Sequence, residues 1–255
     1  MYTPELVQEL RGHEWLRKLR TEIATSASGF SHPSREEEEW RYSPIDKLEL
    51  GRFTPVLSKP LIMPNDAKKK SDGFHTISTV DGYLLSHDQL DTYDVHSVSD
   101  LEEPIEFETP ADMLGSMNLA FSPDPVLIRV PRGSRVDLPL IIDHRWEKES
   151  AACFPLIRIE IEESAEIEIV EIFHHAEVDS LIVPETKIVI GNGSNVNYQQ
   201  VQNLGPNVWQ LGTLDVSVGQ QANFHGAIAA IGGSYARLKT NCCLDGRGAS
   251  GKVSA

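Results

Sequence analysis

A strand-and-turn phrase recurs at a nearly fixed step through the second half of this chain. Each copy has an alternating apolar and polar run, a tight corner of small or polar residues, and a second alternating run. The small residue in each corner stands at position 134, 165, 194, 222 or 249, so that successive copies are 31, 29, 28 and 27 residues apart. A period of this size, made from short strands, predicts a stacked coil instead of a closed globule. The last copy is cut off in mid-strand at Ala255.

Two architectures produce short strands at even intervals. A coil of roughly 28 residues holds two strands and a β-helix stacks such coils, whereas an antiparallel sandwich also spaces its strands evenly. A sandwich does not require the same small residue in every corner. In a stacked coil the corners lie above one another, so the same steric demand returns at each turn. The repeat therefore favours a mainly β fold built as a parallel β-helix.

The chain divides into three regions. Residues 1–53 are expected to form a helical N-terminal region, residues 54–122 an irregular and mixed connecting region, and residues 123–255 the β-helix core. The alternation is plainest at residues 157–161 and 167–172, where one face is apolar and the other is charged. Strand signals in the core cover Val126–Val130, Val136–Ile142, Leu156–Ile161, Ile167–Phe173, Lys187–Ile190, Val196–Val201, Leu211–Val218, Ala222–Ala229 and Ala236–Leu244.

Local signals before the core predict short elements. An apolar stripe predicts an amphipathic helix over residues 3–25. The capping-box pattern at residues 34–37 precedes a short helix that Pro44 ends. Asp81-Gly82 predicts a turn between two strands, and residues 110–121 are typical of a helix.

Charge and cysteine content exclude several classes of protein. With 23 Lys and Arg against 38 Asp and Glu, the net charge of −15 argues against binding to nucleic acid or to anionic membranes. The run Lys68-Lys69-Lys70 is too short to change this and predicts a solvated loop. Three cysteines, two of them adjacent, suggest no disulfide framework. Without a signal-peptide pattern or an apolar stretch of membrane-spanning length, we expect a cytoplasmic protein.

An ordered set of short motifs resembles the SufB/SufD family of iron–sulfur cluster assembly proteins. The resemblance covers roughly residues 34–255, and its early segments are more similar to SufD than to SufB. The motifs are Glu37–Tyr42, Met117–Phe121, Val130–Gly133 with Leu138–Leu140, Tyr198–Gln202, Gly232-Gly233 and Leu244–Ala249.

This resemblance implies a right-handed parallel β-helix between a helical N-terminal part and a C-terminal helical part. It also implies a non-catalytic scaffold subunit that pairs with a SufB-like subunit and binds a SufC-like ATPase through the C-terminal part. The iron–sulfur cluster, built with sulfur from a cysteine desulfurase, is then a transient cargo of the complex, and this segment alone is expected to bind no cofactor.

The family continues beyond the position of Ala255, so the resemblance also implies that the sequence is C-terminally incomplete. The histidine that the family associates with the cluster lies in the part without a counterpart here. We therefore assign no catalytic residue and no metal ligand, and the cofactor-binding residues stay unknown.

Several residues could carry chemistry but have a simpler structural interpretation. Neighbours on a strand point to opposite faces, so Cys242 and Cys243 cannot chelate one ion together, and neither can His174 and His175. We expect one of these cysteines to fill the coil interior and the other to face solvent or a partner, with a thiol role in sulfur or iron handling as the alternative. His225 is expected at the surface if Phe224 points inward.

Other signals point to structure. Gly193, Gly232 and Gly233 are expected in turns with positive φ. Trp40 and Tyr42 could form a docking surface, but aromatic side chains of a short helix that pack on the core are favoured. The chain has no phosphate-binding loop, so any ATPase activity must come from a partner.

Two functions from different classes remain open. The leading hypothesis is the scaffold subunit, which predicts association with a SufB-like chain or with a second copy. The alternative is an enzyme on a β-helix, such as a polysaccharide lyase or an acyltransferase. A lyase is expected to have a secretion signal and a cluster of carboxylates and basic residues on one coil face, and an acyltransferase a six-residue repeat; neither pattern is visible in the sequence. A carbohydrate-binding module is disfavoured because only 7% of the residues are aromatic.

Overall fold

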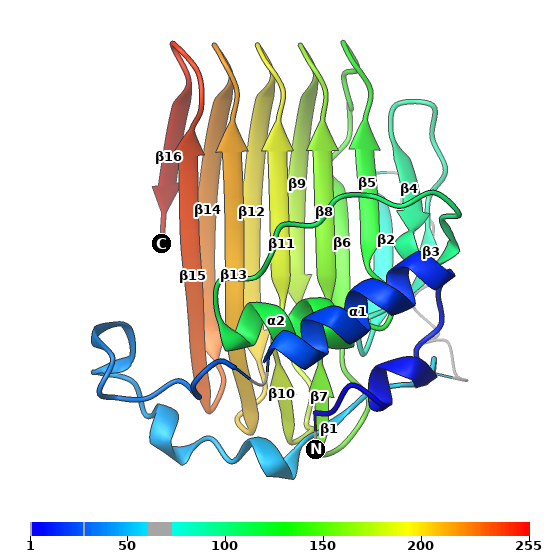
Figure 1. Ribbon diagram of the computed structural model, residues 1–255. Helices are drawn as coiled ribbons and strands as arrows, with labels where there is room; N and C mark the ends of the chain where they lie inside the picture. The colour runs from blue at the N-terminus through cyan, green and yellow to red at the C-terminus, as the bar shows by residue number, and fades with distance from the viewer. Residues whose placement is uncertain (1, 28, 61–72) are drawn as a thin grey trace.

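The computed structural model describes residues 2–27, 29–60 and 73–255. These residues form a parallel β-solenoid of about four turns that is preceded by a few short helices (Figure 1). The predicted mainly β fold built from stacked parallel coils is therefore confirmed, and the alternative of an antiparallel sandwich is excluded. The predicted loop at Lys68-Lys69-Lys70 lies outside the described residues.

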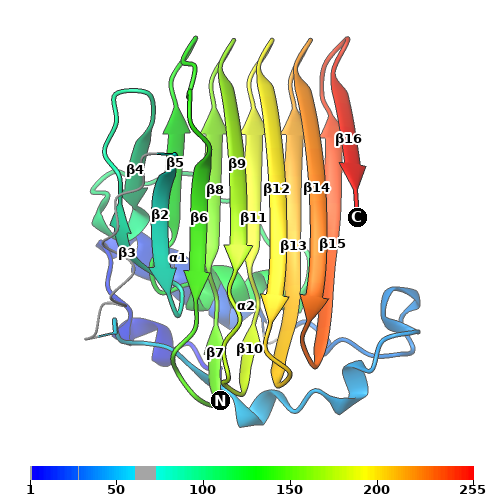
Figure 2. The same ribbon diagram turned by 180° about the vertical axis from the view of Figure 1, so that it is seen from behind.

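Two sheets form the two broad faces of the solenoid, and Figures 1 and 2 show one each. Sheet A contains, in spatial order, β1 (Thr54–Pro55), β7 (Ala151–Cys153), β10 (Ser180–Ile182), β13 (Val208–Val218), β11 (Glu185–Ile190), β8 (Leu156–Ile161), β5 (Val126–Val130) and β4 (Asp94–Ser97), with β15 (Tyr235–Leu244) also paired to β13. Sheet B contains β16 (Ser250–Ser254), β14 (Asn223–Gly232), β12 (Asn195–Leu204), β9 (Glu166–Phe173), β6 (Leu140–Arg145), β2 (His75–Val80) and β3 (Tyr83–His87). Among the described strands, only the β2–β3 and β4–β5 pairs are antiparallel.

The corners of successive coils stack as the repeat predicts. The carbonyl at each of the first four marked corners accepts a 2.9 Å hydrogen bond from an amide of the next coil, and the pairs are Glu166 to Ser134, Asn195 to Ala165, Asn223 to Ser194 and Ser250 to Ala222. The residue before each mark has a positive φ: Gly133 (70°), Ser164 (61°), Gly193 (70°), Gln221 (55°) and Gly248 (76°). A left-handed residue at the same corner of every coil is thus the physical basis of the repeat.

Prolines interrupt the sheet A side of two coils. The short strands β7 and β10 are not predicted by the sequence patterns; they end just before Phe154-Pro155 and Val183-Pro184. Because proline has no amide hydrogen, it cannot donate to the ladder at these positions. The same effect corrects the predicted strand Val136–Ile142, since β6 begins only after Pro139.

The N-terminal helices differ from the single predicted one. Instead of one helix over residues 3–25, the chain forms the 3₁₀ turn η1 (Leu6–Glu9) and α1 (Glu14–Ala27). Gly12, with φ of 144°, breaks the helix between them because this backbone conformation is not helical. The other short turns are η2 (Glu38–Trp40), η3 (Ile45–Lys47), η4 (Leu50–Arg52) and η6 (Val98–Asp100).

Two further local predictions are confirmed. The turn between β2 and β3 has positive φ at both Asp81 (50°) and Gly82 (86°), as a tight hairpin requires. The predicted helix near residues 110–121 is α2 (Met113–Phe121), and the Asp112 side chain caps it by accepting from the Gly115 amide at 2.8 Å.

Two apolar layers hold the fold together. The first fills the interior between the sheets, where side chains such as Ile128, Ile159 and Phe224 are fully buried. The second lies between the outer face of sheet A and the helices α1 and α2 that cover it (Figure 1). No helix covers the outer face of sheet B in the described chain (Figure 2). None of the described helices has the length and apolar content needed to cross a bilayer.

The corner geometry predicts the effect of single substitutions. We expect Gly193→Ala to lower the free energy of unfolding by about 1 kcal/mol, because a Cβ atom disfavours the left-handed conformation. Ser164→Gly, at the equivalent corner, should not lower it. The control is Gly51→Ala, since Gly51 has no positive φ and a Cβ there would have no neighbour within 4 Å. Urea denaturation measures all three, and equal midpoints for Gly193→Ala and Gly51→Ala would contradict the corner argument.

Candidate functional site

The cysteines lie where strand geometry predicts. On β15, Cys242 is half-buried and packs against the interior apolar layer, whereas Cys243 is exposed on the opposite face. Cys153 is buried, and its Sγ lies 3.9 Å from Asp81 Oδ1. Burial and the Asp81 charge raise the pKa of the Cys153 thiol, which disfavours the reactive thiolate.

The three histidines considered in the sequence analysis do not form a cluster. His174 pairs with Asp143, while His175 Nε2 lies 2.8 Å from Glu177 Oε1, so the neighbours have different carboxylate partners. His225 is exposed and Phe224 is fully buried, which confirms the predicted orientation of β14. Among the described residues, no group of three His, Cys, Asp or Glu side chains is placed to hold a metal ion.

The two aromatic residues near the N-terminus, Trp40 and Tyr42, differ in burial. Trp40 packs in the layer over sheet A, and the Arg237 guanidinium lies 4.1 Å from the centre of its ring. Tyr42 is 93% exposed, so the prediction that both rings pack on the core is wrong for Tyr42. Gly232 and Gly233 have φ of 76° and 86°, which confirms them as turn residues together with Gly193.

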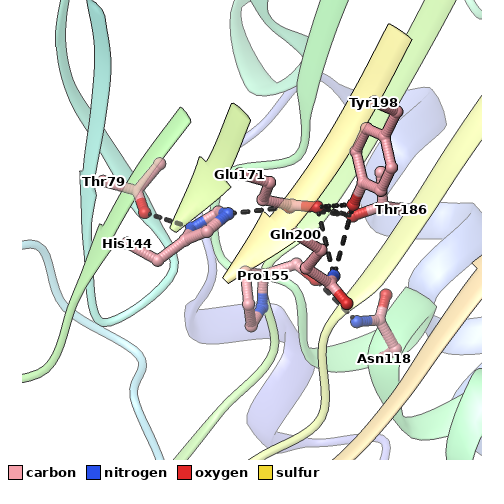
Figure 3. A network of polar contacts seen from close by, with 8 residues as sticks. All are labelled: Thr79, Asn118, His144, Pro155, Glu171, Thr186, Tyr198 and Gln200. Carbon is pink, nitrogen blue, oxygen red and sulfur yellow. Dashed lines mark hydrogen bonds and ion pairs between the residues drawn. The ribbon is translucent and has the colours of Figure 1, made fainter. Parts of the chain in front are cut away.

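A group of polar side chains lies inside the solenoid and joins both sheets (Figure 3). None of its members is more than 2% exposed. We call this group the buried polar network; it consists of Thr79 on β2, His144 on β6, Glu171 on β9, Thr186 on β11, and Tyr198 and Gln200 on β12.

His144 bridges two coils within this network. Its Nδ1 lies 2.7 Å from Thr79 Oγ1 and its Nε2 lies 2.9 Å from Glu171 Oε1. Nε2–H donates to Glu171, while Nδ1 accepts from the Thr79 hydroxyl in the neutral ring and donates to it in the imidazolium, so both contacts are satisfied in either state. The ring also stacks on Phe173, with 4.7 Å between ring centres.

Glu171 is the centre of the network. Its carboxylate accepts hydrogen bonds from Thr186 Oγ1 at 2.9 Å, from the Tyr198 hydroxyl, and from Gln200 Nε2 at 3.4 Å. Burial raises the pKa of Glu171, but the hydrogen bond and charge of His144, with the bonds from Tyr198 and Thr186, outweigh burial and leave the pKa below its ordinary value. Burial and the Glu171 charge raise the pKa of Tyr198, so its hydroxyl remains a donor.

The sealed geometry decides what this network can do. A substrate cannot reach these side chains, because protein atoms cover them almost completely. The network is therefore not a catalytic site in this conformation. It fixes instead which residues of successive coils face one another. A shift of two residues, which keeps Glu171 facing inward, would leave its charge unpaired in the interior.

The network is not predicted from the sequence, because the alternation at residues 167–172 predicts one apolar and one charged face. That description is wrong at Glu171, which lies in phase with the buried residues Ile167, Ile169 and Phe173. Charged Glu168 points outward, whereas Glu171 points inward. The break in alternation, with Val170 and Ile172 on the outer face, is the signal that could have revealed the buried carboxylate.

Comparison with known proteins finds a family whose core domain matches most of the solenoid coils. Residues 144–255 match the family described as "SUF system FeS cluster assembly, SufBD core domain". Curated relatives are iron–sulfur cluster assembly SufBD family proteins of Staphylococcus saprophyticus and Staphylococcus epidermidis. Each is 27% identical over 131 residues, which cover 49% of this chain and 28% of the relative. The chain thus spans less than a third of the length of the curated relatives it matches.

The buried ion pair predicts a large stability effect. We expect His144→Ala to lower the free energy of unfolding by about 3 kcal/mol, since it leaves the buried Glu171 carboxylate without its main partner. His225→Ala is the matched control because His225 is exposed. Urea denaturation followed by circular dichroism compares the two, and an equal loss would show that the network contributes little.

The direction of the Glu171 pKa shift predicts a pH dependence. Because the folded-state pKa lies below the ordinary value of 4.5, the carboxylate contributes stability that is complete above pH 4.5 and is lost as the pH falls through the folded-state pKa. In Glu171→Gln we expect the unfolding free energy to vary less with pH in this acidic range than in the wild type. Glu168→Gln, an outward substitution on the same strand, should keep the wild-type slope; an unchanged slope in Glu171→Gln would contradict the assignment.

Proposed function

Because the chain belongs to the SufB/SufD family of iron–sulfur cluster assembly proteins, we propose that it is a non-catalytic scaffold subunit of a SufBCD-like complex. The observation that carries the proposal is the match of residues 144–255, which include the strands from β7 to β16, to the SufBD core domain. The subunit acts by contact with other proteins in the assembly of iron–sulfur clusters.

The proposed partners are a SufB-like subunit and a SufC-like ATPase. In this arrangement the chain takes the SufD position, which the early motifs at residues 37–42 and 117–121 favour. A stacked solenoid suits such a role, because its sheets are rigid and present one continuous strand-built face. The outer face of sheet B, which no described helix covers, is such a face (Figure 2).

The iron–sulfur cluster is the cargo of this complex in our proposal, not a resident cofactor of the chain. The absence of a three-ligand group among the described residues is compatible with a cluster held jointly with a partner. The thiols of Cys153, Cys242 and Cys243 are free, which suits the reducing cytoplasm that we propose as the compartment.

Co-purification tests the scaffold function. The full-length protein carrying an affinity tag would be co-expressed with the SufB-like and SufC-like proteins of its own genome. We expect both to elute with it as one species in gel filtration, whereas an unrelated tagged β-solenoid protein should retain neither. Recovery of the tagged protein without either partner would overturn the proposal.

A second measurement separates the scaffold from the enzyme alternative. The purified protein would be incubated with acidic polysaccharides and, separately, with an acyl-CoA donor and acceptor amines. We expect no turnover of either substrate. Catalytic release of unsaturated sugar or of free CoA would show that the chain is an enzyme of the β-helix class.

A further inference from the structure

A cleft lies between the outer face of sheet A and the segment that leads into α2. In Figure 1 the chain between β4 and α2 runs across the front of this sheet. We call residues 106–112 the strap; Arg158 on β8 donates to its Glu106 carbonyl oxygen. The cleft beneath the strap has a volume of about 170 Å³.

The floor of the cleft is set by the register of three strands. Glu185 on β11 faces Thr213 on β13, and Asp215 is the next outward residue along β13. Asp215 in turn faces Asn241 on β15, whose Nδ2 donates to Asp215 Oδ1 at 2.6 Å. Three oxygen-bearing side chains, Glu185, Thr213 and Asp215, therefore occupy adjacent positions on one face of the sheet.

Every cation of the cleft already has a carboxylate partner. Lys187 pairs with Glu108 of the strap, Lys239 lies 3.6 Å from Asp112, and Arg158 Nε donates to Glu160 at 2.7 Å. In contrast, the Glu185 carboxylate has no hydrogen bond or ion pair within the described chain, although protein atoms cover most of it. Four carboxylates (Glu108, Asp112, Glu185 and Asp215) and three cations (Lys187, Lys239 and Arg158) line the cleft, so its lining carries one net negative charge.

The electrostatics of Glu185 agree with this count. Burial and the negative charges of Asp215, Asp112 and Glu108 raise the pKa of Glu185 to about 7, while Lys187 opposes the rise. Near neutral pH a proton therefore partly neutralises this carboxylate. A ligand that brings its own positive charge would compete with that proton.

We propose that the cleft binds a primary ammonium group at the end of an alkyl chain. An ammonium group has three N–H donors, and Glu185, Asp215 and Thr213 supply three acceptors on adjacent outward positions. The apolar side chains of Phe107, Leu119 and Leu156 also line the cleft and would contact the alkyl chain.

The surroundings disfavour a divalent metal ion as the occupant. Lys187 and Lys239 line the same cleft, and their charges would repel a doubly charged ion more than a single ammonium group. The described residues also offer no group of three metal-binding side chains. The ammonium group can come from a free alkylamine or from a lysine side chain of another protein, since both present the same chemistry.

Calorimetric titration of the purified chain tests the proposal. The probes are 1,4-diaminobutane, for a free amine, and Nα-acetyl-lysine amide, for a protein lysine; 1,4-butanediol is the uncharged control. We expect amine binding at about pH 8 that weakens towards about pH 6, because the proton displaces the ligand from Glu185 while the amines stay charged. Binding of the diamine alone assigns the site to free amines, and binding of the lysine amide alone or of both assigns it to lysine side chains.

Substitutions make the test specific. Glu185→Gln should weaken amine binding at pH 8 at least about tenfold and remove its pH dependence, because a charge-assisted hydrogen bond is lost. Thr213→Val, which removes one acceptor without changing charge, should weaken binding as well, whereas Glu168→Gln on sheet B should not. The proposal is overturned if no amine binds, if butanediol binds equally well, or if Glu185→Gln and Thr213→Val both bind like the wild type.

Discussion

The solenoid depends on a backbone conformation that recurs once in each coil. A residue in the left-handed region, such as Gly193 or Gln221, turns the chain sharply, and the next carbonyl then accepts from an amide of the following coil. Because every coil repeats this corner, the strands of both sheets remain in register over the whole stack. Glycine meets the requirement at no steric cost, while Ser164 and Gln221 meet it with strain that the neighbouring coils must offset.

Polar interactions inside the stack add specificity that apolar packing does not supply. A shift of two residues would keep rows of Ile and Val facing the interior, but the Glu171 carboxylate has well-placed partners in only one arrangement of the coils. Its partners come from three other strands and from both sheets. The network therefore couples the sheets to each other, which suits a subunit whose proposed work is to hold a fixed surface for its partners.

The two faces of the solenoid differ in chemistry. Sheet A is covered by helices and by the strap, and the surplus carboxylate of Glu185 lies beneath that cover. Sheet B has no such cover in the described chain, and its outward side chains include Asn197, Gln199 and His225. The proposed contact between subunits and the proposed recognition of a small cationic group would thus take place on opposite sides of the solenoid.

By itself, the sequence determined the parallel coil and the order of most strands, because period and alternation are local properties of the chain. It also determined that Phe224 and His225, like Cys242 and Cys243, point to opposite faces, but not which member of the cysteine pair points inward. It did not determine the break of the first helix at Gly12, the short strands before Pro155 and Pro184, or the exposure of Tyr42. Nor could it show the partners of Glu171 or the isolation of Glu185. Both depend on which side chains of distant coils meet. Only the tertiary structure decides whether a carboxylate is buried, and whether it has a hydrogen-bond or cation partner.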